Sequence, residues 1–404
     1  MRIITDKNKI KEVLTRGVEE IYPSYKALEK AMLSGKRIKL YCGFDPSAPS
    51  LHIGNAIQLN KLAQFQELGH EVIFLIGDFT GMIGDPTDKT AARKKMTRKE
   101  VLQNSKNYKK QASVYLKFSG VNPAKILYNS QWSDKITFKD LIEISSNFTV
   151  QQMIQRDMFQ KRLKEEKPIH LHEFLYPLAQ GYDSVAMDVD LEIGGSDQMF
   201  NMLAGRNLMK AIKNKEKFVL TNKLLVDPTG KKMGKTEGNI INLDVSPENM
   251  YGQVMAWPDS LISIGFELCT KMRMEKLKEI DKQLNVGKIN PRDLKMQLAY
   301  EITRIVHGEA KAKKAEDNFI KTVQRKETPD EVKSKNMEQK TWNIVELLVE
   351  CDLASSKGEA RRLITQNAIK VDGKIIEDAN KKIEISKNAV LLQRGKRQFI
   401  KVTS

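Results

Sequence analysis

A segment suited to phosphate binding lies at residues 44–55, FDPSAPSLHIGN, where Gly54 follows His52 by two positions. The apolar spacing after residue 51 is typical of a helix, so the two residues would stand at a helix start. Helix N-termini present free N–H groups to phosphates, and glycine lets a ligand approach the backbone closely. We therefore predict that His52 faces a nucleotide. An ordinary helix cap is the alternative, because so short a motif has low specificity.

A second segment, KKMGKT at residues 231–236, has groups that can stabilise a transferring phosphoryl group. Lys232 and Lys235 stand three residues apart in a stretch rich in Gly, Thr and Asn. Mobile ammonium groups can follow the phosphoryl group and neutralise the charge that develops on it. For this motif alone, a solvated loop is the alternative. Because the two motifs bracket one predicted domain, we interpret them together as a nucleotide site.

The elements around the first motif predict a βαβ unit. Alternating apolar residues indicate a strand at 36–44, helical spacing follows at 51–70, and EVIFLIG at 71–77 is typical of a buried parallel strand. Strands and helices then alternate, with predicted strands at 125–129, 185–195 and 217–220 and predicted helices at 139–163, 172–182 and 196–213. This alternation predicts an α/β fold, with a doubly wound, Rossmann-like catalytic domain over residues 1–244.

Beyond this domain the sequence pattern changes. Residues 245–321 have helical spacing throughout and predict an α-helical domain. Residues 322–341 combine few apolar residues with many charges, which is typical of a linker. Residues 342–404 pass from helices to short strands with an Asp-Gly turn, and predict a small α+β domain.

The composition is that of a globular protein, with 40% hydrophobic and 29% charged residues in a chain of 404. No apolar run is long enough to span a membrane, and the N-terminus lacks the features of a signal peptide, so we expect a cytoplasmic protein with no membrane partner. Three scattered cysteines give neither a disulfide framework nor metal-ligand spacing. His170 and His172 have no third ligand nearby, and we interpret them as structural.

The charge balance favours a polyanionic partner. Lys and Arg number 68 against 51 Asp and Glu, which gives a formal net charge of +17. A basic surface is typical of nucleic-acid binding. A generally lysine-rich composition is the alternative explanation of the same balance.

The two motifs resemble the signatures of class I aminoacyl-tRNA synthetases. HIGN at 52–55 is similar to His-Ile-Gly-His, and KMGKT at 232–236 is similar to Lys-Met-Ser-Lys-Ser. The segments YCGFDPSAPSLHIGN, GDFTGMIGDPTDK, HEFLYPLAQGYDS and EIGGSDQMFN resemble those of bacterial tyrosyl-tRNA synthetases, and the likeness covers most of the chain. It implies activation of L-tyrosine with ATP and transfer to the 3′ end of tRNA(Tyr). It also implies Mg²⁺ accompanying ATP, no protein-bound metal, and a homodimer.

The sequence departs from these signatures at several positions. Asn55 replaces a histidine, Gly234 replaces the first serine of the second signature, and Thr236 replaces its last serine. Asn can still donate a hydrogen bond to a phosphate or ribose oxygen, and Gly and Thr keep the loop mobile and hydroxylated. Both lysines are kept. The resemblance thus implies a catalytic set of His52, Asn55, Lys232, Lys235 and Thr236.

Three polar residues in HEFLYPLAQGYD predict one wall of a pocket. Tyr176, Gln180 and Asp183 are spaced i, i+4 and i+7 and share one helix face. The resemblance implies that Asp183, with Tyr41, binds the phenol hydroxyl of tyrosine. It implies that Asp85, with Tyr176 and Gln180, binds the substrate ammonium. An ordinary half-buried tyrosine and a turn aspartate are the alternatives for Tyr176 and Asp85.

The resemblance also implies contacts for the nucleotide and for the rest of the amino acid. Gln198 would bind tyrosine and Asp197 the ribose, although both follow a strand where a helix start capped by Ser196 is the alternative. The other implied ATP contacts are Asp45, Gly54, Lys89, Arg93 and Lys235. A solvated basic loop is the alternative for Lys89 and Arg93.

The C-terminal domain, with SSKGEARRLITQNAIKVDGK and LLQRGKRQF, is similar to the ribosomal-protein-like RNA-binding module that ends bacterial tyrosine enzymes. The implied phosphate contacts are Arg361, Arg362, Lys370, Arg394, Lys396 and Arg397. A solvated surface on a small packing domain is the alternative. The resemblance places the anticodon side of the enzyme in the helical domain at 245–321.

Three other functions fit part of these observations. A pure RNA-binding protein on a synthetase-like body would explain the charge and the C-terminal module, but not the kept lysines and the tyrosine pocket. The tryptophan enzyme of the same subclass is disfavoured by Tyr41 with Asp183. A small-molecule adenylyl-transferring ligase would not need the helical and RNA-binding domains.

Overall fold

The computed structural model describes residues 2–87, 95–226, 240–324, 332–338, 341–386, 388–395 and 398–404. The chain divides into two compact units. One consists of Met1–Asp244 and Pro258–Pro291, and the other of Val245–Trp257 and Arg292–Ser404. In the part of the chain that the structure describes, no helix has both the length and the apolar composition needed to cross a bilayer.

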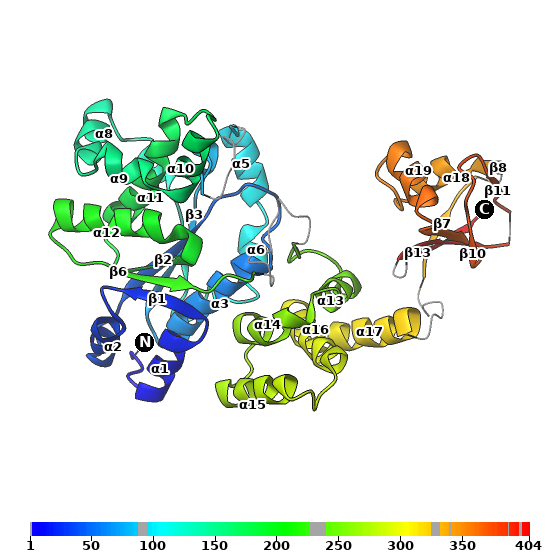
Figure 1. Ribbon diagram of the computed structural model, residues 1–404, viewed down its shortest axis with the longest axis horizontal. Helices are drawn as coiled ribbons and strands as arrows, with labels where there is room; N and C mark the ends of the chain where they lie inside the picture. The colour runs from blue at the N-terminus through cyan, green and yellow to red at the C-terminus, as the bar shows by residue number, and fades with distance from the viewer. Residues whose placement is uncertain are drawn as a thin grey trace. The chain divides into compact units, whose positions relative to one another are not determined.

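A six-stranded sheet forms the centre of the first unit (Figure 1). Its strand order is β1 (Val18–Tyr22), β6 (Phe218–Asn222), β5 (Leu191–Gly195), β2 (Lys39–Phe44), β3 (Glu71–Ile76) and β4 (Lys125–Tyr128). All neighbours pair in parallel except β1, which pairs antiparallel with β6. The chain leaves β2 toward β3 and β4 and later returns to its other side with β5 and β6. The strand order therefore reverses between β2 and β5, which opens a crevice at their carboxyl ends.

Helices cover both faces of this sheet, because right-handed crossovers on the two sides of the reversal fall on opposite faces. Figure 1 shows α3 (Ile53–Glu67) on one side and α11 (Leu171–Met187) with α12 (Met199–Lys213) on the other. The fold is the predicted doubly wound α/β arrangement. The other helices of the unit are α1 (Lys7–Thr15), α2 (Tyr25–Leu33), α4 (Thr80–Ile83), α5 (Arg98–Ser105), α6 (Tyr108–Ala112), α7 (Ser130–Ser133), α8 (Phe138–Ser145), α9 (Val150–Ile154), α10 (Asp157–Lys164), the 3₁₀ turns Ser196–Gln198 and Asp259–Leu261, α14 (Ile262–Cys269) and α15 (Met274–Asn285).

Two predicted elements have different bounds in the structure. The strand predicted at 185–195 was wrong at its start: α11 continues to Met187 and ends at Asp188, which takes a left-handed conformation at φ 50°. The helix predicted at 139–163 is divided into α8, α9 and α10. The first division comes at Thr149, whose capping box begins α9. The sequence analysis did not predict β1, α1 or α2.

The second unit begins with a small group of helices. These are α13 (Pro247–Met255), α16 (Pro291–His307) and α17 (Glu309–Phe319), followed by a π-helical turn at Ile320–Gln324. Helix α13 packs on α17, where the ring centroids of Tyr251 and Phe319 lie 5.3 Å apart. This agrees with the expected helical character of residues 245–321.

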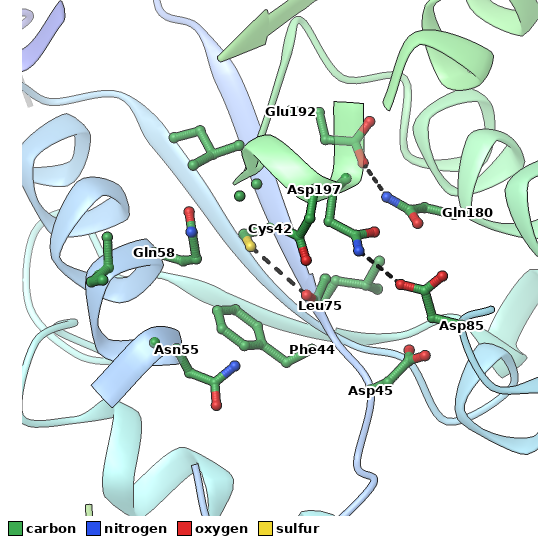
Figure 2. A pocket seen from close by; sticks show the side chains of 18 of the residues that line it. Cys42, Phe44, Asp45, Asn55, Gln58, Leu75, Asp85, Gln180, Glu192 and Asp197 are labelled. Atoms are coloured by element: carbon green, nitrogen blue, oxygen red, sulfur yellow. Dashed lines mark hydrogen bonds between the residues drawn. The ribbon is translucent and has the colours of Figure 1, made fainter. Parts of the chain in front are cut away.

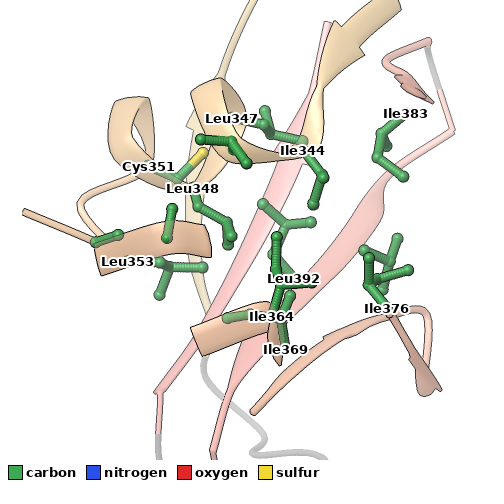
Figure 3. Packing of buried hydrophobic residues seen from close by; sticks show 14 of the residues in the cluster. Ile344, Leu347, Leu348, Cys351, Leu353, Ile364, Ile369, Ile376, Ile383 and Leu392 are labelled. Carbon is green, nitrogen blue, oxygen red and sulfur yellow. The ribbon is translucent and has the colours of Figure 1, made fainter. Parts of the chain in front are cut away.

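The C-terminal part of the second unit has an α+β fold with its own core. Buried side chains of α18 (Ile344–Glu350) and α19 (Lys357–Thr365) meet those of the strands, among them Leu392 (Figure 3). One sheet has the order β10 (Lys374–Ile375), β9 (Ile369–Val371), β12 (Val390–Arg394), β13 (Gln398–Thr403) and β7 (Lys333–Asn336), and the other pairs β11 (Lys382–Glu384) with β8 (Thr341–Asn343).

Strand β7 lies inside the predicted linker at 322–341, so part of this segment has regular structure. It pairs in parallel with β13 at the edge of the sheet. Its sequence, KSKN, has no alternation of apolar residues. Such a strand can still form at the edge of a sheet, because backbone hydrogen bonds to its neighbour hold it there.

Candidate active site

A cavity of about 280 Å³ lies in the first unit at the carboxyl ends of β2 and β5, where the strand order reverses. It is lined by every candidate catalytic, tyrosine-binding and ATP-binding residue that the structure describes. These are Tyr41, Asp45, His52, Gly54, Asn55, Asp85, Tyr176, Gln180, Asp183, Asp197 and Gln198. Figure 2 shows the side chains of Asp85, Gln180 and Asp197 meeting around this cavity, with Asn55 at the start of α3. One pocket therefore unites residues that are far apart in the sequence.

The N-terminus of α3 forms the edge of the pocket suited to phosphate. His52 is the N-cap, and its Nδ1 accepts from the backbone N of Asn55 at 3.4 Å. In return, Asn55 Oδ1 accepts from the backbone N of His52 at 3.0 Å, which completes a capping box. The alternative of a helix cap is thus realised. It leaves Asn55 Nδ2 available as a donor, so capping and phosphate contact are compatible.

The loop before α3 is held by hydrogen bonds from α5 and α6. Asn104 Nδ2 donates to the carbonyl of Pro46 at 2.9 Å, and the hydroxyl of Tyr108 donates to that of Ala48 at 2.8 Å. The side-chain oxygen of Gln111 accepts from the backbone N of Leu51 at 2.7 Å. These bonds fix the backbone that leads into the first motif, and sequence analysis did not predict them.

The described residues on both sides of the second motif lie beside the pocket. Leu225 lines the cavity, and the backbone N of Ile53 donates to the carbonyl of Ile241 at 2.9 Å. The motif residues Lys232, Lys235 and Thr236 lie outside the described residues, and so do Lys89 and Arg93.

Asp183 and Tyr41 stand at the buried end of the pocket. The carboxylate of Asp183 accepts from Trp132 Nε1 at 2.8 Å and from Asn129 Nδ2 at 3.3 Å. Burial raises the pKa of Asp183 well above its usual range, although these two hydrogen bonds oppose the shift. Burial also raises the pKa of Tyr41, whose hydroxyl lies 2.9 Å from Ser184 Oγ. Asp183 and Tyr41 thus place polar groups at this end of the pocket, an arrangement that fits a hydroxylated ligand.

A second set of polar groups lies around Asp85. One carboxylate oxygen of Asp85 accepts from the backbone N and from the hydroxyl of Thr87, so Asp85 has the hydrogen bonds of the turn aspartate given as the alternative. Its other oxygen accepts from Gln198 Nε2 at 2.7 Å. Gln180 Nε2 donates to Glu192 at 3.0 Å, while its buried Oε1 has no hydrogen-bond partner among the described residues. Acceptors that converge in this way suit a substrate ammonium.

Tyr176 and Asp45 form a further hydrogen-bonded pair in the lining of the pocket. The hydroxyl of Tyr176 donates to Asp45 at 2.8 Å, and Asp45 also accepts from Thr80 Oγ1 at 2.7 Å. A Cβ on Gly77 would lie 2.0 Å from the same carboxylate, so only glycine leaves room for it. Asp197 lies in the first turn of the 3₁₀ helix Ser196–Gln198 that leads into α12, so the alternative of a helix start is confirmed. The expected cap by Ser196 was wrong, because Gly195 is the N-cap and no side chain caps this turn.

Several pocket residues were missed by sequence reasoning. Asn129 directly follows β4, and Glu192 stands within the fully buried strand β5; both line the cavity. Trp132 on α7 does not line it but donates to the carboxylate of Asp183. Two signals could have found them: polar residues at the carboxyl end of a parallel strand, and an acid inside an apolar strand. Cys42 also lines the cavity, and burial raises the pKa of its thiol, which makes it a poor nucleophile.

The predicted RNA contacts lie in the C-terminal fold. Arg361 and Arg362 are exposed on α19, and Lys370 is half-buried on β9. Arg394 donates to the carbonyl of Leu353 at 2.7 Å and to Glu359 at 2.8 Å, so it stabilises the fold itself. Lys396 and Arg397 lie outside the described residues.

The two candidate structural histidines lie at the start of α11. The ring centroids of His170 and His172 are 5.7 Å apart, and His170 takes part in a capping box with Glu173. Within the described ranges, no group of three or more His, Cys, Asp or Glu side chains could hold a metal ion.

Comparisons with known proteins identify relatives over nearly the whole chain. The family model of class I tRNA synthetases (W and Y) matches residues 33–324, and that of the tyrosine–tRNA ligase SYY-like C-terminal domain matches residues 324–402. The chain is 44% identical over 402 residues to the tyrosine–tRNA ligase of Thermotoga maritima, covering 99% of this chain and 98% of that protein. It is 41% identical over 401 residues to the tyrosine–tRNA ligase of Mannheimia succiniciproducens, covering 99% and 100%.

Solved structures show the same fold. A C-terminally truncated mitochondrial tyrosyl-tRNA synthetase from Coccidioides posadasii matches with a TM-score of 0.62 at 25% identity, over 77% of this chain and 91% of that chain. The tyrosyl-tRNA synthetase from Archaeoglobus fulgidus complexed with L-tyrosine matches with a TM-score of 0.60 at 20% identity, over 77% and 100%.

The capping box separates two roles of Asn55 that variants can test. Asn55→Ala should lower the free energy of unfolding by about 0.5–2 kcal/mol, because it removes the cap acceptor. Asn55→Asp keeps that acceptor but replaces the Nδ2 donor with a negative oxygen. We expect Asn55→Asp to unfold like the parent while its ATP affinity falls, as measured by denaturant titration and calorimetry. Unchanged ATP affinity in Asn55→Asp would mean that Asn55 is a cap alone.

Proposed function

The chain belongs to the class I tRNA synthetases, in the family of tyrosine–tRNA ligases, and we propose that it activates L-tyrosine with ATP and then transfers the tyrosyl group to the 3′ end of tRNA(Tyr). The observation that carries this proposal is the single pocket in which Asp183 and Tyr41 stand at the buried end and the N-terminus of α3 stands at the edge. A bound tyrosine would direct its hydroxyl inward and its carboxylate toward the phosphates of ATP.

The reaction needs positioning more than covalent chemistry. The tyrosine carboxylate attacks the α-phosphate of ATP, the bond to the β-phosphate oxygen breaks, and tyrosyl-adenylate and diphosphate form. A ribose hydroxyl of the tRNA terminus then takes the acyl group and AMP leaves. Donors at His52, Asn55, Lys232 and Lys235, with Thr236 beside them, would stabilise the charge on the phosphates. Mg²⁺ would enter with ATP, bound to its phosphates.

The nucleotide and the amino acid would occupy different sides of the same cavity. Asp197 and Asp45 would contact the ribose and the ATP, and Gly54 lets the phosphates approach the backbone of α3. Lys89 and Arg93 would contact diphosphate. The ammonium of tyrosine would lie near the carboxylate of Asp85 and the side-chain oxygens of Gln180 and Tyr176. The amide of Gln198 would hold Asp85 in place there.

Selectivity for tyrosine follows from the polar groups at the buried end. When phenylalanine enters such a site, Asp183 and Tyr41 are left without the hydroxyl, and a site of this kind can discriminate by about 10⁴–10⁵. The tryptophan enzyme of the same family is the second candidate, and this pair of residues disfavours it, because an indole presents no hydroxyl there.

Exposed apolar side chains support a homodimer. Phe138 on α8, Val150 on α9 and Leu171 on α11 are 79%, 72% and 77% exposed, and Figure 1 shows α8 to α11 grouped together. Apolar surface of this kind marks an interaction site. We take the occupant to be a second copy of the chain, as the family resemblance implies.

Asp183→Asn tests the phenol site. It keeps the shape of the side chain but weakens the acceptor, and a hydrogen bond to a charged group contributes about 1.5–3 kcal/mol. We expect kcat/KM for tyrosine in diphosphate–ATP exchange to fall by roughly 10- to 100-fold, with little change for phenylalanine. Asp190→Asn is the matched control, because Asp190 is also buried but does not line the pocket. Parent activity in a folded Asp183→Asn protein would refute the phenol assignment.

Truncation separates amino-acid activation from tRNA binding. The C-terminal core consists of residues beyond 336, so a chain that ends near residue 325 should still make tyrosyl-adenylate. Its tRNA affinity should fall, and the salt dependence of the remaining binding should become shallower, because fewer phosphates are neutralised. In the full-length chain, the double variant Arg361→Ala/Arg362→Ala should also lower the tRNA affinity and make its salt dependence shallower, but by less than the truncation does. Undiminished tRNA charging by the truncated chain would exclude this module as the tRNA-binding element.

Charge substitution tests the proposed dimer. Phe138→Asp with Leu171→Asp should reduce the mass in sedimentation equilibrium from twice 46.1 kDa to 46.1 kDa. The control Val121→Asp changes an equally exposed apolar residue outside α8 to α11 and should leave the mass unchanged. A parent protein that sediments as a monomer would contradict the proposal.

A further inference from the structure

A buried lysine lies behind the amino-acid pocket. Lys217, directly before β6, is 0% exposed. Its ammonium donates to the carboxylate of Glu192 and, at 2.8 Å, to Ser184 Oγ. Glu192 lines the cavity, whereas Lys217 and Ser184 are not among the described residues that line it. The ammonium is therefore separated from the substrate space by one layer of side chains.

Two hydrogen-bonded connections lead from this ammonium to pocket side chains. Through Ser184 it reaches Tyr41, whose hydroxyl lies 2.9 Å from Ser184 Oγ. Through Glu192 it reaches Gln180, whose Nε2 donates to the carboxylate at 3.0 Å, as Figure 2 shows. Tyr41 belongs to the phenol end and Gln180 to the ammonium end of the proposed tyrosine site. One buried cation is thus connected to both ends.

The close approach of α11 and α12 makes a narrow space for this lysine. A Cβ on Gly205 would lie 2.7 Å from Lys217 Nζ and 3.0 Å from Ser184 Oγ. A Cβ on Gly181 would lie 3.1 Å from the backbone N of Gly205. Because both glycines lack a side chain, the ammonium fits between the helices and has little freedom to move.

We propose that Lys217 is a positioning residue for amino-acid selection, which holds Tyr41 through Ser184 and Gln180 through Glu192 without touching the substrate. The proposal rests on the tyrosine site proposed above. It adds a residue that neither faces the pocket nor belongs to either signature motif.

The direction of the hydrogen bonds explains how Lys217 prepares Tyr41. An ammonium can only donate, so it occupies a lone pair of Ser184 Oγ. The hydroxyl proton of Ser184 has two acceptors within reach, Tyr41 at 2.9 Å and Glu192 at 3.5 Å, and the shorter contact favours Tyr41. A proton directed to Tyr41 leaves the proton of Tyr41 for the pocket. In this arrangement Tyr41 donates to the phenol oxygen of a substrate and Asp183 accepts its proton. Phenylalanine satisfies neither group.

The charge of Lys217 also keeps Glu192 in place. Glu192 is 2% exposed, and a buried carboxylate without a partner is strongly unfavourable. Without the ammonium, the carboxylate of Glu192 would lose its charged partner and turn away, which alters the acceptor for Gln180 Nε2. Burial lowers the pKa of Lys217, and the charge of Glu192 opposes this shift.

The test compares Lys217→Met with the double variant Lys217→Met/Glu192→Gln in the full-length enzyme, by diphosphate–ATP exchange with tyrosine and with phenylalanine. We expect Lys217→Met to raise KM for tyrosine about tenfold or more, which corresponds to about 1.4 kcal/mol, and to lower the tyrosine-over-phenylalanine ratio. KM for ATP should stay near the parent value.

The double variant should restore what the single variant loses. The amide introduced at position 192 can donate toward Ser184, whose Oγ lies 3.5 Å from the carboxylate oxygen that the amide replaces, and it can still accept from Gln180. KM for tyrosine and the tyrosine-over-phenylalanine ratio should therefore recover to within about threefold of their parent values. This remaining difference is smaller than the tenfold change, about 1.4 kcal/mol, expected for the single variant.

A matched control is Lys61→Met. Lys61 is equally buried, but its ammonium donates to the backbone carbonyls of Val13 and Arg16 at 2.7 and 2.8 Å. This variant should lose stability and keep the tyrosine-over-phenylalanine ratio. Thermal unfolding of each variant shows whether the protein is folded before its kinetics are compared. If Lys217→Met does not fold, the double variant is used to test the proposal.

Three outcomes would overturn the inference. They are parent KM and selectivity in a folded Lys217→Met protein, an equal loss of selectivity in Lys61→Met, or a folded double variant that does not recover. A parent enzyme without tyrosine-dependent exchange would instead contradict the proposed function itself, so the two failures are distinguishable.

Discussion

The reversal of strand order between β2 and β5 is the constraint on which the first unit depends. These two strands are neighbours in the sheet, but the chain builds β3, β4 and several helices before it returns to form β5. Loops that leave the carboxyl ends of the two strands therefore diverge to opposite sides and leave a crevice. The helix that follows β2 directs its N-terminus to one edge of this crevice, and α11, which packs on α12, directs its polar face into the other. In the proposed function, the topology thus places the phosphate-binding end of the cavity on one side of the reversal and the amino-acid-binding end on the other.

The buried end of the cavity shows how selectivity and stability oppose each other. Asp183 and Glu192 are each about 2% exposed, and burying carboxylates is unfavourable unless donors surround them. Trp132 and Asn129 supply donors to the first, and Lys217 and Gln180 to the second. A purely apolar wall would be easier to stabilise, but it could not distinguish a phenol from a benzene ring by more than the modest effect of size and shape. In the proposed function, the polar groups therefore stand where the phenol hydroxyl would be recognised.

Much of this arrangement could be predicted from sequence, and the limits have physical causes. Periodicity found β2, β3 and the helix between them, and i, i+4, i+7 spacing placed Tyr176 and Asp183 on one face, because local spacing determines which residues share a face. Periodicity missed β1 and β7, which are edge strands held mainly by their neighbours' backbone groups. It placed Lys217 at the start of the strand predicted at 217–220 but did not predict its burial, because lysines are mostly exposed. Only the tertiary approach of two helices at glycines shows that it is buried.

Asparagine at position 55, where the signature has histidine, can meet two demands on one side chain in the proposed function. The helix start needs an acceptor for the backbone N–H of His52, and Asn55 Oδ1 supplies it. A phosphate next to the same helix start needs a donor, and the Nδ2 of the same amide can supply it. Aspartate would satisfy the first demand and repel the phosphate, whereas alanine would satisfy neither. An amide combines acceptor and donor without depending on a protonation state, unlike imidazole, whose donor and acceptor nitrogens change with tautomer and pH. The departure from the signature is therefore consistent with the same chemistry at this helix terminus.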